Sequence, residues 1–125
     1  MMGESLYEQL GEQNLRLLLD RFYDLVFSNE VIGHLFKTDK EEIKEKQRLF
    51  LTQFFGGPPL YSQKWGHPKL RARHLPHPIT DESASAWLSC MSEALHTLDV
   101  DQSIKDEIFK RLLPTAMFMV NTPGE

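Results

Sequence analysis

The stretches GGPPLY (residues 56–61) and GHPKLRARHLP (residues 66–76) hold the densest run of glycine and proline in the chain. Because these residues interrupt helices, the first stretch is expected to end a helix and begin a loop. Pro68 suits the first turn of a short basic helix that ends near His74. We therefore expect the short helix to direct the His74 side chain towards the part of the protein that packs opposite it.

Before this segment, apolar residues recur at spacings of three and four, and no window shows the alternation of a strand. One helix is expected to begin near Glu12, with Gly11 separating it from a shorter opening segment. Another is expected to follow Thr38 or Asp39, whose side chain can accept hydrogen bonds from its first amides, and to end at Gly56.

Two longer helices are expected after the glycine- and proline-rich segment. Thr80 and Asp101 can cap them, and Pro114 is expected to bend the second. The pattern therefore predicts an all-α fold. A chain of 125 residues fits one compact domain, which we expect to cover residues 1–125.

The composition is that of an ordinary soluble domain, with 41% hydrophobic and 26% charged residues. No apolar run approaches the roughly 20 residues of a membrane helix, and the start of the chain does not resemble a signal peptide. The single cysteine, Cys90, lies in an apolar helical pattern and indicates no disulfide framework. We expect a cytoplasmic protein that does not bind membranes.

The net charge is −4 at pH 7, and the basic residues are scattered except at Lys69, Arg71 and Arg73. This distribution argues against nucleic acid as the main partner, because nucleic-acid binding usually requires an extended basic face. A small anion is a more suitable ligand than nucleic acid for the cluster of Lys69, Arg71 and Arg73.

Three expected helices each carry one side chain that can donate a hydrogen bond from a largely apolar face, namely Tyr23, Gln47 and Trp87. A fourth segment carries the imidazole of His74. Each residue alone has an ordinary explanation, since a lone histidine is more often a buried, satisfied side chain or a helix cap. Together they are the side chains expected to line a cavity that holds a metal-bound ligand.

Other chemistries fit the sequence less well. A zinc site would use His67, His74, His77 and Cys90, but prolines interrupt the histidines and no carboxylate or cysteine stands at a familiar spacing. Cys90 lacks a nearby base, so we expect an inert buried thiol rather than a nucleophile. Gly56 and Gly57 are followed directly by two prolines, whose nitrogens carry no hydrogen to donate to a phosphate. The sequence therefore indicates no phosphate-binding loop.

Several sequence blocks resemble the group II truncated haemoglobins: Phe22-Tyr23, Phe36, FLTQFFGGPP at 50–59, GHPKLRARH at 66–74 and AWLSCM at 86–91. The resemblance covers about Leu6 to Val120. It implies a two-over-two helical sandwich around haem b, with His74 as the proximal iron ligand.

The resemblance also implies which residues surround the haem. Tyr23, Gln47 and Trp87 are expected to line the distal side, and Phe36 to pack on the porphyrin. The other expected haem-contacting residues are Ile43, Lys46, Phe50, Tyr61, Leu70 and Arg73, of which Lys46, Tyr61 and Arg73 suit the propionates.

One residue departs from the family pattern. Ile43 stands where this group usually carries a small or hydroxylated residue, and an isoleucine cannot donate a hydrogen bond. Its effect on the route by which a ligand reaches the iron is left open by the sequence.

The function implied by the resemblance is reversible binding of oxygen or other diatomic ligands at a five-coordinate haem iron. One alternative is a peroxidase-like or nitric oxide dioxygenase-like enzyme that uses the same residues with an electron-donating reductase. Another is a haem-free helical sensor or interaction module of globin descent. The physiological ligand and the oligomeric state are not determined by the sequence.

Overall fold

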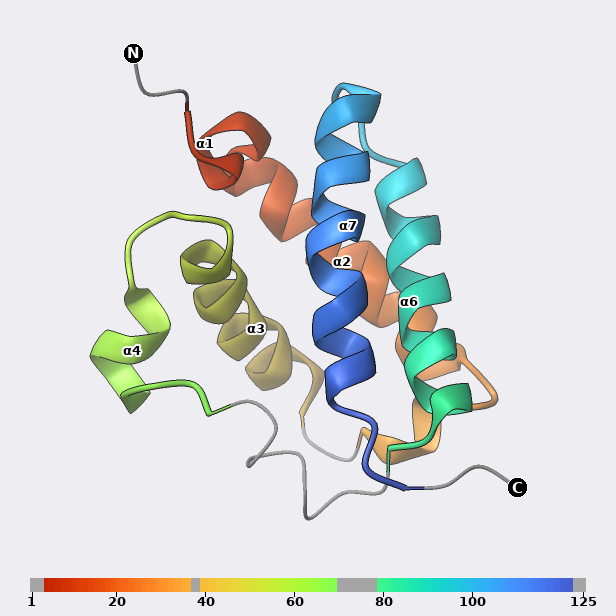
Figure 1. Ribbon diagram of the computed structural model, residues 1–125. Coiled ribbons are helices and arrows are strands. Elements are labelled where there is room, and N and C mark those ends of the chain that lie inside the picture. The colour runs from red at the N-terminus through yellow and green to blue at the C-terminus, as the bar shows by residue number, and fades with distance from the viewer. Residues whose placement is uncertain (1–3, 37–38, 70–78, 123–125) are drawn as a thin grey trace.

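The computed structural model describes residues 4–36, 39–69 and 79–122, and every regular element in these ranges is a helix (Figure 1). The elements are α1 (Leu6–Leu10), α2 (Glu12–Ser28), the 3-10 turn η1 (Gly33–Leu35), α3 (Lys40–Phe54), α4 (Leu60–Trp65), α6 (Asp81–His96) and α7 (Gln102–Phe118). Within these ranges no helix is both long and apolar enough to cross a membrane. The all-α prediction is confirmed.

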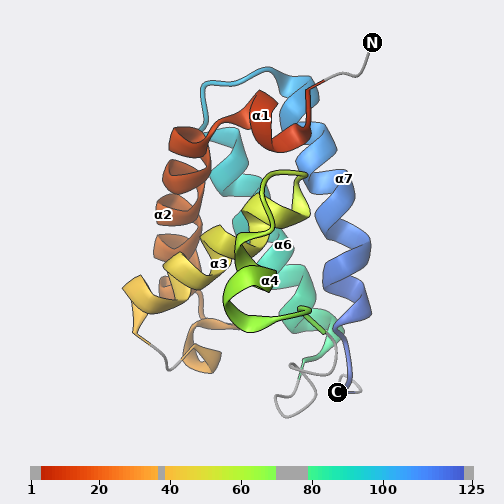
Figure 2. The same ribbon diagram turned by 90° about the vertical axis from the view of Figure 1, so that its left-hand side faces the viewer.

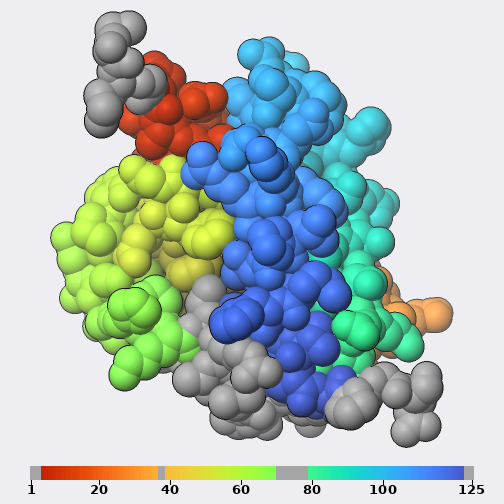
Figure 3. All heavy atoms as spheres, in the orientation of Figure 1, coloured from red at the N-terminus to blue at the C-terminus, as the bar shows by residue number. Residues whose placement is uncertain are grey.

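The four long helices form two layers. α6 and α7 lie side by side, α2 packs against α6, and α3 crosses α2 with α4 on its outer side (Figures 1 and 2). In the space-filling view α7 runs along the front of the molecule, between α3 and α4 on one side and α6 on the other (Figure 3). This arrangement is the predicted two-over-two helical sandwich.

Two of the three expected helix caps make the side-chain hydrogen bonds of a cap. Asp39, rather than Thr38, caps α3, because its carboxylate accepts hydrogen bonds from the Glu41 and Glu42 amides at 3.0 and 3.1 Å. Thr80 accepts one from the Ser83 amide at 3.0 Å and caps α6.

Asp101 does precede α7, but its side chain makes no capping hydrogen bond. Its backbone carbonyl instead accepts from the Ile104 amide at 3.0 Å. The position of the cap was therefore predicted correctly, and the role of its side chain was not.

The segment after Gly56 contains a helix, α4, where the sequence predicted only a loop. Pro59 stands at its N-cap position, where a missing backbone N–H costs nothing, so the prolines lead into the helix and do not interrupt it. Gln53 fixes α4 to α3, because its amide oxygen accepts from the Ser62 backbone at 3.0 Å and its amide nitrogen donates to Ser62 Oγ at 2.8 Å.

One of the ion pairs of Lys44 on the outer surface joins α3 to α2, and the other lies within α3. Lys44 lies 2.9 Å from Asp20 on α2 and 2.8 Å from Glu41. Hydrogen bonds to these two carboxylates raise the pKa of Lys44 above its usual value. Because α3 carries several predicted site residues, the Lys44–Asp20 pair contributes to the crossing that places them.

Gly57 allows a close approach between the end of α3 and α1. A Cβ at this position would lie 2.6 Å from Cδ2 of Tyr7 and 2.8 Å from the backbone oxygen of Thr52. The Gly57 amide donates to that oxygen at 2.8 Å, and the Tyr7 amide donates to the Phe55 carbonyl at 2.8 Å. The space for a side chain is therefore taken by fixed backbone and a packed ring.

Gly57→Ala is expected to lower the free energy of unfolding by about 1–3 kcal/mol, because the added methyl group overpacks this contact. Urea unfolding followed by circular dichroism measures the change. Gln63→Ala, on the exposed side of α4, serves as the control and should shift stability by no more than about 0.5 kcal/mol. Equal unfolding midpoints for the Gly57 variant and the parent would show that the contact relaxes without cost.

Candidate functional site

Two of the predicted site residues, Tyr23 and Trp87, meet at the ring of Phe22, and a third, Phe36, packs against Tyr23. The Phe22 ring centroid lies 4.9 Å from that of Tyr23 on α2 and 4.9 Å from that of Trp87 on α6, both edge to face. Phe36, just after η1, lies 6.2 Å from Tyr23 in the same manner. The fold thus brings together side chains from two long helices and the turn between α2 and α3.

Asn29 shapes the turn that carries Phe36. It follows the last residue of α2, and its Oδ1 accepts from the amides of Val31 and Ile32 at 2.8 and 3.1 Å. Its Nδ2 points at Cys90 Sγ, 3.8 Å away on α6. One side chain therefore closes the turn and attaches it to the opposite layer.

The thiol of Cys90 is buried, as the sequence predicted. Burial raises its pKa above the usual value, so the thiol stays protonated at neutral pH. This environment favours the interpretation of Cys90 as an inert core residue.

The hydroxyl of Tyr23 is the unusual polar group of this cluster. The side chain is 2% exposed, and burial alone raises its pKa above the ordinary tyrosine value, with no hydrogen bond contributing. No residue within 4–36, 39–69 or 79–122 accepts a hydrogen bond from it. Its hydroxyl oxygen is not among the fully enclosed, unpartnered polar atoms of the described residues, where Thr52 Oγ1 alone is found, so Tyr23 can donate to a bound molecule that reaches it.

Trp87 and Gln47 likewise carry hydrogen-bond donors that the described residues do not use. Both are half-buried, and within the described part of the chain neither the Trp87 indole N–H nor the Gln47 amide has a hydrogen-bond partner. Gln47 follows Ile43 by one helical turn and shares its face of α3. Ile43 packs against the core, on the helix that crosses α2.

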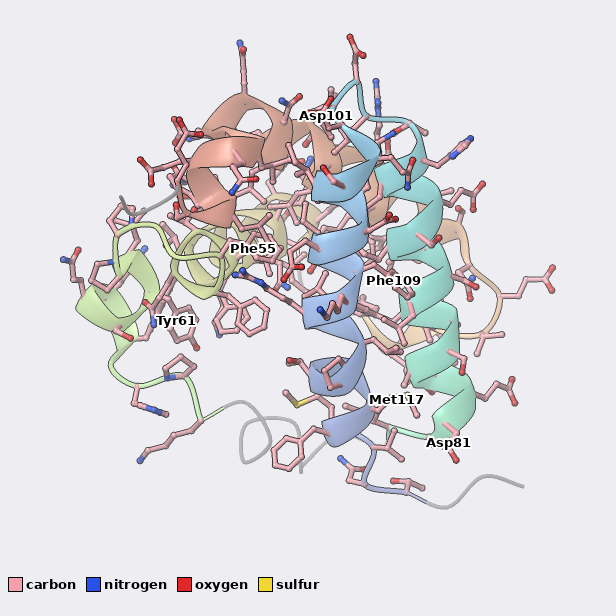
Figure 4. All side chains as sticks on the ribbon, turned by 45° about the horizontal axis from the view of Figure 1, so that its top comes forward. Phe55, Tyr61, Asp81, Asp101, Phe109 and Met117 are labelled. Carbon is pink, nitrogen blue, oxygen red and sulfur yellow. The ribbon has the colours of Figure 1, made fainter. Side chains whose placement is uncertain are left out.

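Phe50 on α3 and Tyr61 on α4, the latter labelled in Figure 4, form a second aromatic group. Phe50 is 8% and Tyr61 3% exposed, and their ring centroids lie 5.8 Å apart. Lys46, one turn before Phe50, lies with its Nζ 5.5 Å from the ring centroid of Trp65 on α4. Trp65 was missed by the sequence analysis, although its spacing of four from Tyr61 would place both on one face had the helix been predicted.

Three predicted site residues, Leu70, Arg73 and His74, lie outside the described residues.

Two surface hollows are lined by residues other than Phe22, Tyr23 and Trp87. One, of about 420 Å³, lies between α6 and α7 and includes Leu95, Phe109 and Leu113, and the other, of about 270 Å³, lies between α2 and α3 beside Lys44 and Arg48. Neither is lined by Tyr23, Gln47 or Trp87, so neither is the predicted site.

Comparison with known proteins identifies the family. Residues 5–121 match the family described as bacterial-like globin. The chain is 49% identical over 123 residues to the group 2 truncated hemoglobin YjbI of Bacillus subtilis (strain 168), covering 96% of this chain and 93% of that protein.

Solved structures agree with this match. The group II truncated hemoglobin of Bacillus anthracis superposes with a TM-score of 0.95 at 44% identity, covering 100% of this chain and 97% of that one. The truncated oxygen-avid haemoglobin of Bacillus subtilis superposes with a TM-score of 0.91 at 48% identity, covering 94% and 100%. The chain therefore belongs to the bacterial-like globin family, and its relatives there are group II truncated haemoglobins.

Proposed function

We propose that this chain binds haem b and reversibly binds oxygen at that haem. The observation that carries the proposal is the hydroxyl of the buried Tyr23 side chain, which has no acceptor among the described residues and whose ring lies with that of Trp87 at Phe22. The family match and the similarity to a haemoglobin described as oxygen-avid support it. Haem supplies an iron whose free face can take a diatomic ligand.

The described residues suit a haem on two grounds. The rings of Phe36 and Phe50 supply apolar contact area for a flat porphyrin. Tyr23 and Trp87 supply donors that are not used within the described protein, and such donors need a polar partner when buried.

We assign the residues around the haem to the iron ligand, the propionate partners and the distal side. His74 is proposed to hold the iron through a neutral imidazole, beside Leu70. Lys46, Tyr61 and Arg73 are proposed to bind the propionates, because ammonium, phenol and guanidinium groups all donate to carboxylates.

The distal residues are proposed to select for oxygen. Oxygen bound at a haem iron would be a stronger hydrogen-bond acceptor than carbon monoxide, so a hydrogen bond donated by these residues would slow the loss of oxygen more. The Tyr23 hydroxyl is proposed as the main donor, with the Trp87 indole and Gln47 amide beside it. Ile43 adds apolar bulk on the Gln47 face of α3 and no donor.

The visible absorbance spectrum of the purified protein is the primary test of haem binding. We expect one haem b per chain and a five-coordinate ferrous spectrum. Oxygen should then dissociate more slowly from the parent than from variants that lack the distal donors, and carbon monoxide dissociation should differ less between them. A protein that stays colourless when mixed with haem would contradict the proposal and favour a haem-free helical module.

Trp87→Phe is expected to speed oxygen dissociation by about 2- to 12-fold, because it deletes one hydrogen-bond donor worth about 0.5–1.5 kcal/mol. The phenylalanine keeps most of the contact with Phe22, so unfolding should change by less than about 1.5 kcal/mol. Stopped-flow measurement of oxygen and carbon monoxide dissociation checks the result.

Combining Trp87→Phe with Tyr23→Phe tests whether both donors act on the same oxygen. Two donors to one acceptor are coupled, so the double variant should differ from the product of the two single effects. A Trp87 variant with a lower melting temperature but unchanged kinetics for both gases would mark Trp87 as a core residue alone.

A further inference from the structure

Asn29 lies where the three segments that carry the distal aromatic residues come together. It directly follows α2, which carries Tyr23, and it begins the turn that leads through η1 to Phe36. Its side chain faces Cys90 on α6, three residues after Trp87. From the end of α2, one half-buried side chain therefore contacts both the turn and α6.

The two ends of the Asn29 side-chain amide have different partners, and these partners fix its orientation. The backbone amides of Val31 and Ile32, 2.8 and 3.1 Å from Oδ1, can only donate, so they require the oxygen. This leaves Nδ2 to donate to Cys90 Sγ at 3.8 Å. A carboxamide serves both sides at once, whereas a carboxylate would have no N–H for the sulfur.

The Cys90 end of this link is buried, with the side chain 4% exposed. Burial and the charge of Glu93 raise the pKa of the thiol, and the hydrogen bond from Asn29 acts in the opposite direction. The protonated sulfur is chemically inert but can accept a weak hydrogen bond. Because Cys90 follows Trp87 by three residues, the two lie on one side of α6, so the link holds this helix about one turn from the Trp87 side chain.

The turn itself is closely packed against the end of α2. The Gly33 amide donates to the Asn29 carbonyl at 2.9 Å, and a Cβ at position 33 would lie 2.9 Å from the carbonyl oxygen of Phe27. The ring centroid of Phe36 lies 6.2 Å from that of Tyr23 and 6.0 Å from that of Phe27. The position of the turn therefore sets the position of a ring that packs beside Tyr23.

We propose that Asn29 is a positioning residue for the two distal donors. By linking the turn to α6, it holds the Tyr23 hydroxyl and the Trp87 indole in the relative position in which both can donate to one ligand. Asn29 itself does not contact the ligand. The proposal rests on the proposed function, because it requires a ligand bound at a haem. Hydrogen bonds weaken as their angle bends, so a small shift of α6 relative to α2 costs donor strength while the fold stays intact.

Infrared spectroscopy of the ferrous, carbon monoxide-bound protein is the first test. Donors near the oxygen atom of carbon monoxide lower the C–O stretching frequency, so the band reports their distance and direction without measuring ligand release. Asn29→Ala is expected to move the band to higher frequency. It should also speed oxygen dissociation by about 2- to 12-fold, the range for the loss of one hydrogen bond.

Two substitutions at Cys90 separate the link to α6 from the turn. Cys90→Ala removes the sulfur that accepts from Asn29 and leaves the hydrogen bonds of Asn29 Oδ1 in place. Cys90→Ser also removes the sulfur but supplies an oxygen that can accept from Asn29. The C–O band should move in the alanine variant in the same direction as in Asn29→Ala, and should lie nearer the parental frequency in the serine variant.

Nuclear magnetic resonance provides a readout that does not depend on ligand release. The chain has two tryptophans, so nitrogen-labelled protein gives two indole N–H signals. Asn29→Ala and Cys90→Ala should each shift the signal of Trp87 on α6 and leave that of Trp65 on α4 in place.

Asn14 provides the matched control. It is also half-buried, and its Nδ2 donates to the Leu10 carbonyl at 2.9 Å near the start of α2. Asn14→Ala makes the same chemical change away from the turn. It should leave the C–O band and the Trp87 signal unchanged.

The outcomes separate this proposal from the proposed function. Haem content is measured beforehand, so a colourless chain contradicts the proposed function, while the Trp87 signal is still read in that protein. A lower melting temperature in Asn29→Ala with an unchanged C–O band and Trp87 signal would overturn the positioning role and leave a structural turn residue. Equal band shifts in Cys90→Ala and Cys90→Ser, or in Asn14→Ala and Asn29→Ala, would overturn it too, because lost volume or general destabilisation would explain them.

Discussion

Replacing His74 by glycine is expected to abolish stable retention of haem b. The imidazole of His74 is the proposed protein bond to iron, and its removal takes away the main anchor of the group. The haem-to-protein ratio after gel filtration should fall from about one to near zero, and added imidazole should restore a five-coordinate ferrous spectrum by filling the vacated space.

The neighbouring histidine provides a matched control. His67 is exposed, and its Nδ1 accepts a hydrogen bond from the Lys69 amide at 3.3 Å. His67→Gly should therefore retain haem with the parental spectrum. A His74→Gly protein with that same five-coordinate ferrous spectrum would refute the assignment, and His77 would become the residue to replace next.

The fold was predictable to the extent that it depends on local patterns. The apolar spacing in α2 and α6 determines which side of each helix is buried, and Thr80 caps α6 as expected. α4 was not predicted, because prolines at 58 and 59 were interpreted as the start of a loop. Its stability comes partly from the Gln53–Ser62 hydrogen bonds, which join two helices and leave no periodic signal.

The candidate site was predicted mainly from resemblance. Spacing along one helix cannot give the distance between two helices, so the meeting of Tyr23 and Trp87 at Phe22 becomes visible only in the structure. Trp65 was missed because its helix was missed. The role of His74, the single domain over residues 1–125 and the cytoplasmic location stay predictions.

Tyr23→Phe is expected to speed oxygen dissociation by about 10- to 100-fold. The substitution removes one hydrogen bond to a strongly polarised acceptor, worth about 1.5–3 kcal/mol, and leaves the buried ring in contact with Phe22 and Phe36. Carbon monoxide dissociation should change much less, because that ligand is a weaker acceptor. Stopped-flow displacement of each gas measures both rates.

The buried environment of Tyr23 adds a pH test and a matched control. Burial raises the pKa of its hydroxyl, so the neutral, donating form persists as pH rises through about 10, the ordinary tyrosine pKa. Oxygen dissociation from the parent should therefore stay constant across that range. Tyr7→Phe makes the same chemical change on α1, beside Gly57, and should leave both gases unaffected. Unchanged oxygen release in Tyr23→Phe would show that its hydroxyl does not reach the ligand or that Gln47 and Trp87 replace it, and the double variant with Trp87→Phe distinguishes these two explanations.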